Sequence, residues 1–409
     1  MVNHILLSLL AISILSTGIL GVTPSHAASD KIPDNYIVVL NDGISHPSSV
    51  ANDMAKQHGL SITHVYGTAI KGYSAVIPPG QLDKVVSDPR VKYVEQDAVV
   101  TIDKQPTNDK KPSNPGHGGS SSGGTSDPPQ ETPTGISLIQ GPGVLTNQVD
   151  VAVIDTGIDV DHPDLNVVGG ANFVFKGKNS YDDGNGHGTH VAGTIGAIDN
   201  AIGVVGVAPG VNLWAVRVLD NSGSGTYSGV IAGVDWVAAQ KDPVDNTKPL
   251  IEVANMSLGG GFSQALNDAV ANAINAGVVF AIAAGNDSAD ASNYSPASTP
   301  EAITVSALDD RDGTLDSTDK FASFSNYGNV IDIIAPGVYI KSTWKGGGYN
   351  TISGTSMATP HVAGAAALYL SSHNATPQQV RDYLVNNGNL TWSGTGDPDG
   401  IHEPLVYLP

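Results

Sequence analysis

The sequence of 409 residues contains no cysteine, and basic residues are scarce. Without cysteine there can be no disulfide bond and no thiolate metal site, so stability must come from the size of the core and from bound ions. Nineteen Lys and Arg residues against 39 Asp and Glu residues give a formal net charge of −20. This excess of negative charge argues against a nucleic-acid partner and leaves carboxylates available for calcium.

Apolar runs long enough to enter a membrane are also lacking, except near the N-terminus. Residues 5–22 are almost wholly apolar, and residues 25–27 (Ser-His-Ala) provide the small side chains that a signal peptidase requires. A membrane anchor is the alternative interpretation, but this run is short and contains polar residues and glycine. We expect residues 1–27 to be a signal peptide, and the protein to be secreted with no membrane contact after its removal.

The region after this leader divides into a small domain and a linker. Residues 28–103 predict a small α+β domain, with strands at 36–40, 72–77 and 92–95 and helices at 50–58 and 81–87. Residues 104–129 are mostly Gly, Ser, Pro, Asn and Lys without apolar periodicity, which is typical of a flexible linker.

Residues 130–409 predict a larger α/β domain. Short apolar runs alternate with helical stretches, at 149–154, 211–219, 250–256, 278–284 and 303–307. Continuous apolar strands of this kind indicate a mostly parallel central sheet with helices on both faces. In such sheets, reacting groups gather at the carboxyl ends of the strands.

Segment 353–367 joins a glycine-containing turn to a run of small apolar residues. It predicts a tight turn and a buried helix, with Ser356 in the first turn of that helix. The N–H groups and partial positive charge of a helix N-terminus would stabilise an oxyanion beside such a serine. A serine here can also act only as a helix cap, so the segment alone leaves both interpretations open.

Three other polar residues lie where a catalytic serine needs partners. Asp155 and Asn286 each follow an apolar strand, and His187 follows a glycine-rich loop at the start of a predicted helix. An acid, a histidine, an amide donor and a serine match the orienting group, base, oxyanion donor and nucleophile of a hydrolase. Taken singly, Asp155 and Asn286 are ordinary turn residues. His187 and His190 could form a metal site, although no Glu or Cys accompanies them.

Together, the segments VIDTG (153–157), GHGTHVAGT (186–194) and GTSMATPHVA (354–363) resemble the subtilisin-like serine proteases. The resemblance extends from about residue 130 to the C-terminus, and segments 293–298 and 324–328 look most like proteinase K. Residues 28–103 resemble the inhibitory propeptide of these enzymes, and 130–409 their catalytic domain. The resemblance implies a self-processing zymogen in which the propeptide assists folding and then inhibits.

The resemblance also assigns roles to the residues of the motifs. Asp155 would orient His187, which would take the proton from Ser356, and His190 would be structural. The oxyanion would be held by the Asn286 side chain and the Ser356 N–H. Protein or peptide substrates would bind as an added strand, with broad specificity for apolar or aromatic residues, between Gly223-Ser224-Gly225 and Ser257-Leu258-Gly259.

Calcium is the cofactor that the resemblance implies, at one or two structural sites. Loop 198–204, which we expect to interrupt the helix at His187, has oxygen donors at alternate positions. With it, the first site would use the side chains of Gln130, Asp164 and Asn200 and the carbonyls of Ile198, Ile202 and Val204. The second would use the carbonyls of Pro300 and Ala302 and the carboxylate of Asp332.

Several alternatives remain open at this stage. The linker is longer than the family usually has, so propeptide cleavage could fall anywhere from Thr101 to Lys111, with Asp103 indicated by counting from Asp97. A catalytically silent binding module and an esterase with the same triad are the competing functions. We expect a monomer that hydrolyses peptide bonds, since the glycine-rich segments suit an extended peptide.

Overall fold

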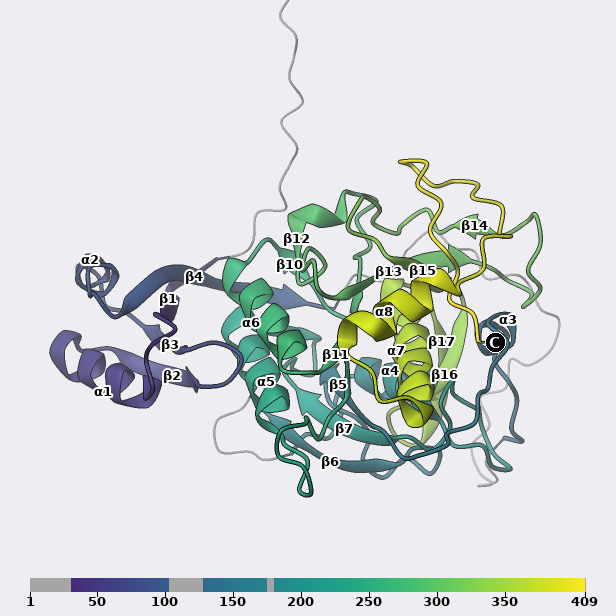
Figure 1. Cartoon of the computed structure of the whole chain (residues 1–409), viewed down its shortest axis with the longest axis horizontal. Helices are drawn as coiled ribbons and strands as arrows, with labels where there is room; N and C mark the ends of the chain where they lie inside the picture. Colours follow the sequence, from purple (N-terminus) through teal and green to yellow (C-terminus); the bar gives the residue numbers. More distant parts are fainter. Residues whose placement is uncertain (1–30, 103–127, 175–179, 409) are drawn as a thin grey trace, which may run out of the picture.

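The computed structural model describes residues 31–102, 128–174 and 180–408, which form two units in contact (Figure 1). The predicted signal peptide and almost all of the predicted linker lie outside these ranges. No helix among the described residues is long and apolar enough to cross a bilayer. The smaller unit consists of β1 (Lys31–Leu40), α1 (Pro47–His58), β2 (Ser61–Tyr66), β3 (Gly72–Val76), α2 (Leu82–Val86) and β4 (Val91–Thr101).

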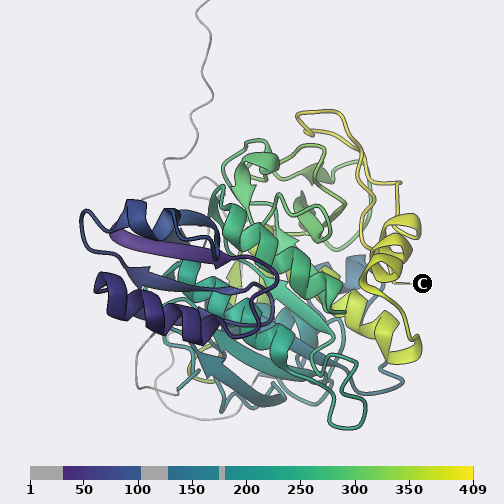
Figure 2. The same ribbon diagram turned by 60° about the vertical axis from the view of Figure 1, so that its left-hand side comes forward.

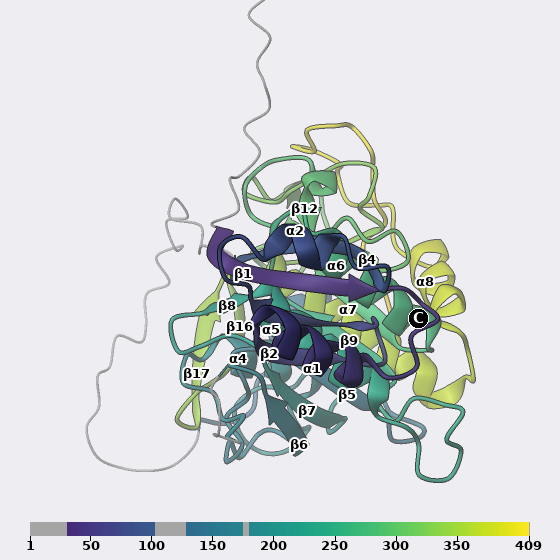
Figure 3. The ribbon, with the colours of Figure 1, turned by 90° about the vertical axis from the view of Figure 1, so that its left-hand side faces the viewer.

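The sheet of the smaller unit is antiparallel and is covered on both faces. Along β1, Val38 and Leu40 pack with α1, whereas Ile37 and Val39 belong to a cluster that includes α5 and α6 of the larger unit. This double burial explains why residues 36–40 form a continuous apolar run. Figures 2 and 3 show the smaller unit lying against the helices of the larger one.

The larger unit is built on an eight-stranded sheet in which every pair of neighbours is parallel except β13 and β14. In spatial order its strands are β14 (Lys320–Phe321), β13 (Ile303–Asp309), β11 (Val279–Ala283), β9 (Val253–Met256), β5 (Asp150–Asp155), β7 (Asn212–Arg217) and β6 (Val167–Asn172), and β15 (Ile333–Pro336) pairs with β13. The remaining strands are β8 (Ser224–Thr226), the pair β10 (Gly260–Gly261) and β12 (Tyr294–Ser295), and the pair β16 (Ile340–Trp344) and β17 (Gly348–Ile352).

Helices cover both faces of this sheet, as the apolar runs predict. Val151 and Val153 of β5 pack on the side of α4 (His187–Gly196), α7 (Thr355–Ser372) and α8 (Pro377–Asn386). Ala152 and Ile154 pack on the side of α5 (Tyr227–Ala239) and α6 (Gln264–Asn275). Two short helical segments, α3 (Thr134–Leu138) and η1 (Ala291–Asn293), lie in connections. The expected mostly parallel α/β architecture is confirmed.

One local expectation is wrong. Loop 198–204 follows α4 instead of interrupting it, because the helix ends at Gly196 and Ala197 is extended. The chain then turns back, and the Gly206 N–H donates to the Ala197 carbonyl at 3.0 Å. The next regular element is β7, so no second half of the helix exists.

Candidate active site

Asp155 and His187 form a buried, hydrogen-bonded pair at the carboxyl edge of the large sheet. Asp155 is the last residue of β5 and His187 is the first of α4. The His187 Nδ1 lies 2.9 Å from each carboxylate oxygen of Asp155. The side chains of His187 and Asp155 are 2% and 0% exposed, so this pair is shielded from bulk water. A Cβ on Gly188 would lie 2.1 Å from the Gly157 carbonyl and 3.2 Å from Asp155, so the close approach requires glycine.

Asp183 fixes the start of α4, a role that the sequence analysis did not identify. One of its oxygens accepts the N–H groups of Asn185 and Gly186 and the hydroxyl of Thr156. The other accepts the N–H and hydroxyl of Thr189. A buried carboxylate with this many donors locks the entry loop and therefore the position of His187. The signal in the sequence was an aspartate four residues before the histidine in a glycine-rich turn.

Ser356 is the second residue of α7, which packs against α4. Gly354 precedes it with φ of 150°, and a Cβ there would come within 3.1 Å of the Asn286 amide nitrogen. The Ser356 Oγ donates to the Ser257 carbonyl at 3.3 Å. Because α4 and α7 both begin at the same edge of the sheet, His187 and Ser356 stand at the starts of neighbouring helices.

Asn286 is held beside Ser356 by the turn that leads into α7. Its Oδ1 accepts the Thr355 N–H at 2.9 Å and the Thr355 hydroxyl at 3.0 Å. Its oxygen is therefore occupied, and the amide nitrogen is the group that can donate to a ligand. Thr355 is a second residue that the sequence analysis did not assign.

The two other histidines near the site are structural. His190 is fully buried, and its Nε2 lies 3.0 Å from the Ile340 carbonyl. Burial lowers the pKa of His190 to about 3 and that of His361 to about 4, so both rings are neutral at physiological pH. For the alternative of a metal held by His187 and His190, no third ligand is at hand, since within the described residues no three His, Asp or Glu side chains are grouped so as to hold a metal ion.

A strand of the smaller unit lies between the predicted substrate-binding segments. Residues Val99–Thr101 of β4 pair antiparallel with Ser224–Thr226 of β8. On the other side, Thr101 exchanges hydrogen bonds with Gly259, at 3.4 and 3.3 Å. The Ile102 N–H donates to the Gly223 carbonyl at 2.9 Å. The structure thus brings both glycine-rich segments around one extended chain, with Ser257 and Leu258 buried behind it.

Two carboxylates of β4 attach this strand to the N-termini of α5 and α6. Asp97 accepts the N–H and hydroxyl of Ser228, at 3.1 and 2.5 Å, at the start of α5. Glu95 accepts the Ser263 hydroxyl at 2.5 Å and the Ala265 N–H at 3.0 Å at the start of α6. Each satisfies helix N–H groups that have no partner within the helix, and negative charge is favoured there. The smaller unit is thereby anchored to the same edge as the site.

Comparison with known proteins identifies both units. Residues 146–400 match the subtilase family of peptidases, and residues 35–103 match the peptidase inhibitor I9 family. The chain belongs to the subtilase family. It is a serine endopeptidase preceded by an inhibitor-type propeptide, and the resemblance inferred from the motifs is confirmed.

Relatives of this subtilase cover most of its length. It is 40% identical to subtilisin NAT of Bacillus subtilis subsp. natto, over 90% of each chain. It is 42% identical to proteinase R of Parengyodontium album, over 89% of this chain and 86% of the relative. A crystal structure of a cold-adapted subtilisin-like serine proteinase is 44% identical, with a TM-score of 0.58, and covers 67% of this chain and 97% of its own.

Three residues of the first predicted calcium site, Gln130, Asp164 and Asn200, contact one another in the fold. Asp164 is fully buried, and its two oxygens accept the Asn200 amide at 2.9 Å and the Val204 N–H at 3.0 Å. Gln130 reaches the same loop, where its Oε1 accepts the Asn200 N–H at 2.5 Å. Burial raises the pKa of Asp164. The donor set, one carboxylate with amide and carbonyl oxygens, fits calcium.

Arg381 contacts two of the residues of the second predicted calcium site. The Asp332 carboxylate accepts two hydrogen bonds from Arg381, from Nε at 3.0 Å and from Nη2 at 2.5 Å. The same guanidinium donates from Nη1 to the Pro300 carbonyl at 2.7 Å. Two of the three expected ligands, Pro300 and Asp332, are therefore partners of Arg381, and calcium at this site stays a prediction.

Proposed function

We propose that this subtilase is a secreted endopeptidase that cleaves peptide bonds with the triad Asp155, His187 and Ser356 and processes its own propeptide. The observation that carries the proposal is the combination of the Asp155–His187 pair with an extended strand held in the adjacent cleft. A strand bound through backbone hydrogen bonds on both sides is the way a protease presents a peptide independent of its sequence.

The chemistry follows from the positions of the groups. Neutral His187 takes the proton of Ser356 as its Oγ attacks the substrate carbonyl, and Asp155 stabilises the imidazolium that forms. The Asn286 amide and the Ser356 N–H donate to the oxyanion. His187 then protonates the leaving amine, and water releases the acyl group from Ser356. By the family resemblance, the small residues at 283–285 (Ala-Ala-Gly) would line the pocket for the substrate side chain that precedes the cleaved bond. Their size would leave room for large apolar side chains.

The register of β4 supports cleavage close behind it. Thr101 pairs with Gly259 and Ile102 with Gly223, so the chain beyond Ile102 continues from the strand held in the cleft. The predicted range from Thr101 to Lys111 includes this position, although residues after 102 lie outside the described part. After cleavage the propeptide would remain bound as an inhibitor through Glu95 and Asp97.

We also propose that a calcium ion binds at Asp164, Gln130 and loop 198–204. Support comes from a fully buried carboxylate that has only neutral donors as partners in the described structure. An ionised carboxylate so placed is stabilised by a divalent cation.

The test is to express the full chain and its Ser356→Ala variant with calcium, and to measure intact mass and casein hydrolysis. We expect the parent to lose its propeptide and digest casein, and Ser356→Ala to stay uncut and to lose activity about 10⁶-fold. Ser372→Ala, an exposed serine at the other end of α7, is the matched control and should behave like the parent.

Two results would overturn the proposal. A folded parent that neither cleaves itself nor digests casein would favour the silent binding module. Hydrolysis of esters without hydrolysis of peptides would favour the esterase.

A further inference from the structure

The C-terminal loop 393–403 contains carboxylates at Asp397, Asp399 and Glu403. The loop turns at Gly400, which has φ of 74°, and the Ile401 N–H donates to Asp399 at 2.8 Å. The neighbouring loop, which carries Asp319, lies beside it in the upper right of Figure 1. Acidic residues alone do not make a site, because exposed carboxylates are well solvated.

Glu403 differs from an exposed acid because it is only 2% exposed. The carboxyl groups of Glu403 and Asp397 lie against each other, and outside this cluster neither oxygen of Glu403, nor the buried Asp397 Oδ2, has a hydrogen-bond partner. Among the ion pairs of the described residues, none joins a lysine or arginine to either side chain. Burial, the negative charges of Asp397 and Asp399, and a hydrogen bond to the Asp397 carboxyl group raise the pKa of Glu403 to about 8.

The backbone holds Glu403 in this position. Its carbonyl accepts the Trp392 indole N–H at 2.8 Å, and Leu405 bridges to both Asn389 and Ile334. The loop is also tied to its neighbour, since the Phe321 N–H donates to the Thr395 carbonyl at 2.9 Å. These contacts keep Glu403 buried, so its carboxyl group needs either a proton or a cation where it stands.

The chemistry of the cluster selects the kind of cation. Every candidate ligand is an oxygen, because the nearby His402 ring packs against Trp392, with centroids 4.6 Å apart. Within the described ranges, no three His, Cys, Asp or Glu side chains are grouped so as to hold a metal ion, so an ion here would take most of its ligands from backbone carbonyls and water. Zinc, which takes nearly all its ligands from such side chains, does not fit. Calcium accepts two carboxylates with backbone carbonyls and water, and Asp397 is open enough for water to reach it.

We propose that Asp397 and Glu403 bind a calcium ion that fastens the C-terminal loop 393–403 to the catalytic domain. This ion would be separate from the one proposed at Asp164. The competing explanation is a single proton shared between the two carboxyl groups, which would satisfy the pair without any metal.

Trp392 makes the site testable by luminescence, since a tryptophan beside a bound Tb³⁺ sensitises its emission. The experiment uses the full chain with Ser356→Ala, which prevents self-digestion. Tb³⁺ emission excited through tryptophan and displaced by Ca²⁺ is measured, together with the number of calcium ions bound at equilibrium.

In this background we expect Glu403→Gln to bind one calcium fewer and to lose the Trp392-sensitised emission at least tenfold. Trp392→Phe should lose the emission and keep the calcium. Asp316→Asn removes an exposed acid of the neighbouring loop and should change neither. If Glu403→Gln does not fold, Asp397→Asn is measured in the same way.

The proposal is overturned if Glu403→Gln binds as much calcium and emits as strongly as its parent. It is also overturned if Glu403→Gln gains thermal stability at neutral pH that calcium does not alter, because a glutamine resembles a protonated carboxyl group and lacks the negative charge that attracts calcium. Neither readout depends on proteolysis, so failure of this proposal is distinct from failure of the proposed activity.

Discussion

At the carboxyl end of β5, Asp155 binds His187, whereas at the amino end of the same strand the Asp150 N–H donates to the Glu252 carboxylate at 2.8 Å. The helices run opposite to the strands. Helices α4 and α7 begin beside Asp155, and α6 and α7 end at the other edge. One edge therefore presents helix N–H groups and the other helix carbonyls, which favour opposite charges.

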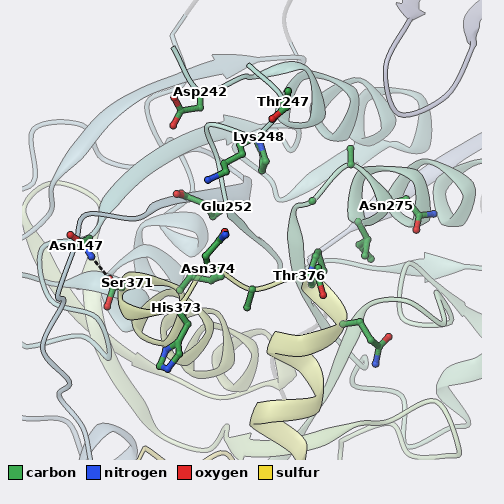
Figure 4. A pocket seen from close by; sticks show the side chains of 18 of the residues that line it. Asn147, Asp242, Thr247, Lys248, Glu252, Asn275, Ser371, His373, Asn374 and Thr376 are labelled. Carbon is green, nitrogen blue, oxygen red and sulfur yellow. Dashed lines mark hydrogen bonds between the residues drawn. The ribbon is translucent and has the colours of Figure 1, made fainter. Parts of the chain in front are cut away.

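The edge with helix C-termini contains a pocket of about 830 Å³ (Figure 4). Glu252 lines it together with Asp242 and Glu301, and the ends of α6 and α7 form part of its wall. Burial raises the pKa of Glu252 to about 7, and the charge of Asp150 contributes. The ionised form of Glu252 is thus disfavoured, although Glu252 directly precedes β9 of the sheet that carries the active site.

Three carboxylates near the starts of strands at this edge are compensated in three ways. Asp332 has the guanidinium of Arg381, Asp164 has neutral donors and the proposed calcium, and Glu252 has one backbone N–H. The comparison teaches that the active-site edge presents helix N-termini, which favour negative charge, whereas a carboxylate at the opposite edge needs a cation or a proton. Each prediction below tests one part of this contrast.

The largest effect is expected at the active-site edge, from Asn286→Ala. We expect kcat on a peptide substrate to fall about 10²- to 10³-fold with little change in KM, the loss typical of one oxyanion donor in this family. Asn272→Ala, an exposed residue of α6, is the control. An unchanged kcat would show that helix α7 alone stabilises the oxyanion.

Arg381→Gln should destabilise the opposite edge by about 3 kcal/mol, because it leaves Asp332 buried without its counter-charge. The side chains of Arg381 and Asp332 are 25% and 11% exposed. The effect is measured by urea unfolding of the Ser356→Ala protein. Arg311→Gln, which breaks an exposed pair with Asp309, should cost less than about 1 kcal/mol. A loss equally small for Arg381→Gln would contradict a need for cations at this edge.

Calcium removal should cost a similar or smaller amount through Asp164. At free calcium 100-fold above the dissociation constant, binding contributes about 2.7 kcal/mol, so a chelator should lower the melting temperature. Asp164→Asn should remove that part of the response, and the exposed Asp161→Asn should keep it. A melting curve that is the same with and without chelator would exclude calcium at this site.

Glu252→Gln should have the smallest effect and should depend on pH. Because folding raises the pKa of Glu252 from 4.5 to about 7, its stabilising contribution is complete below pH 4.5 and is lost as pH rises through 7. The glutamine oxygen can still accept the Asp150 N–H. We therefore expect Glu252→Gln to be more stable than the parent at pH 8, by about 1 kcal/mol for this half-buried group, with no advantage at pH 4.

The control for that measurement is Glu301→Gln, which changes an exposed acid of the same pocket. It should leave the pH dependence of unfolding unchanged. If Glu252→Gln retains the parent's loss of stability between pH 4.5 and 8, another group is responsible for it.

Much of the fold was predictable because buried parallel strands leave continuous apolar runs. β5, β9 and β11 lie within one or a few residues of the runs that predict them. β6 was not identified, since its sequence Val-Val-Gly-Gly-Ala-Asn contains two glycines that admit Trp214 and Tyr181 instead of forming an apolar run. β2 was missed because its side chains are mostly polar or partly exposed.

The active-site motifs were predictable because a strand end and a helix start each require particular neighbours in the sequence. The partner of Asp332 was not predictable, since Arg381 is 49 residues away in the sequence and only the packing of the fold brings the two together. Backbone carbonyl ligands leave no trace in the sequence. The sequence therefore does not tell whether such oxygens bind a calcium ion or an arginine side chain. Glu403 was not predicted as a site residue for the same reason, because its burial is a property of the folded loop alone.

The pairing of β4 with β8 has a consequence for how the enzyme is switched on. The hydrogen bonds of this pairing join residues 99–101 to 224–226. They would therefore remain after cleavage at the proposed position beyond Ile102. Before cleavage the inhibitor is present at a local concentration set by the chain and independent of volume. After cleavage it is a separate molecule that obeys mass action. In the proposed secreted zymogen, export into a large volume would favour its departure, so dilution itself would be the activating signal.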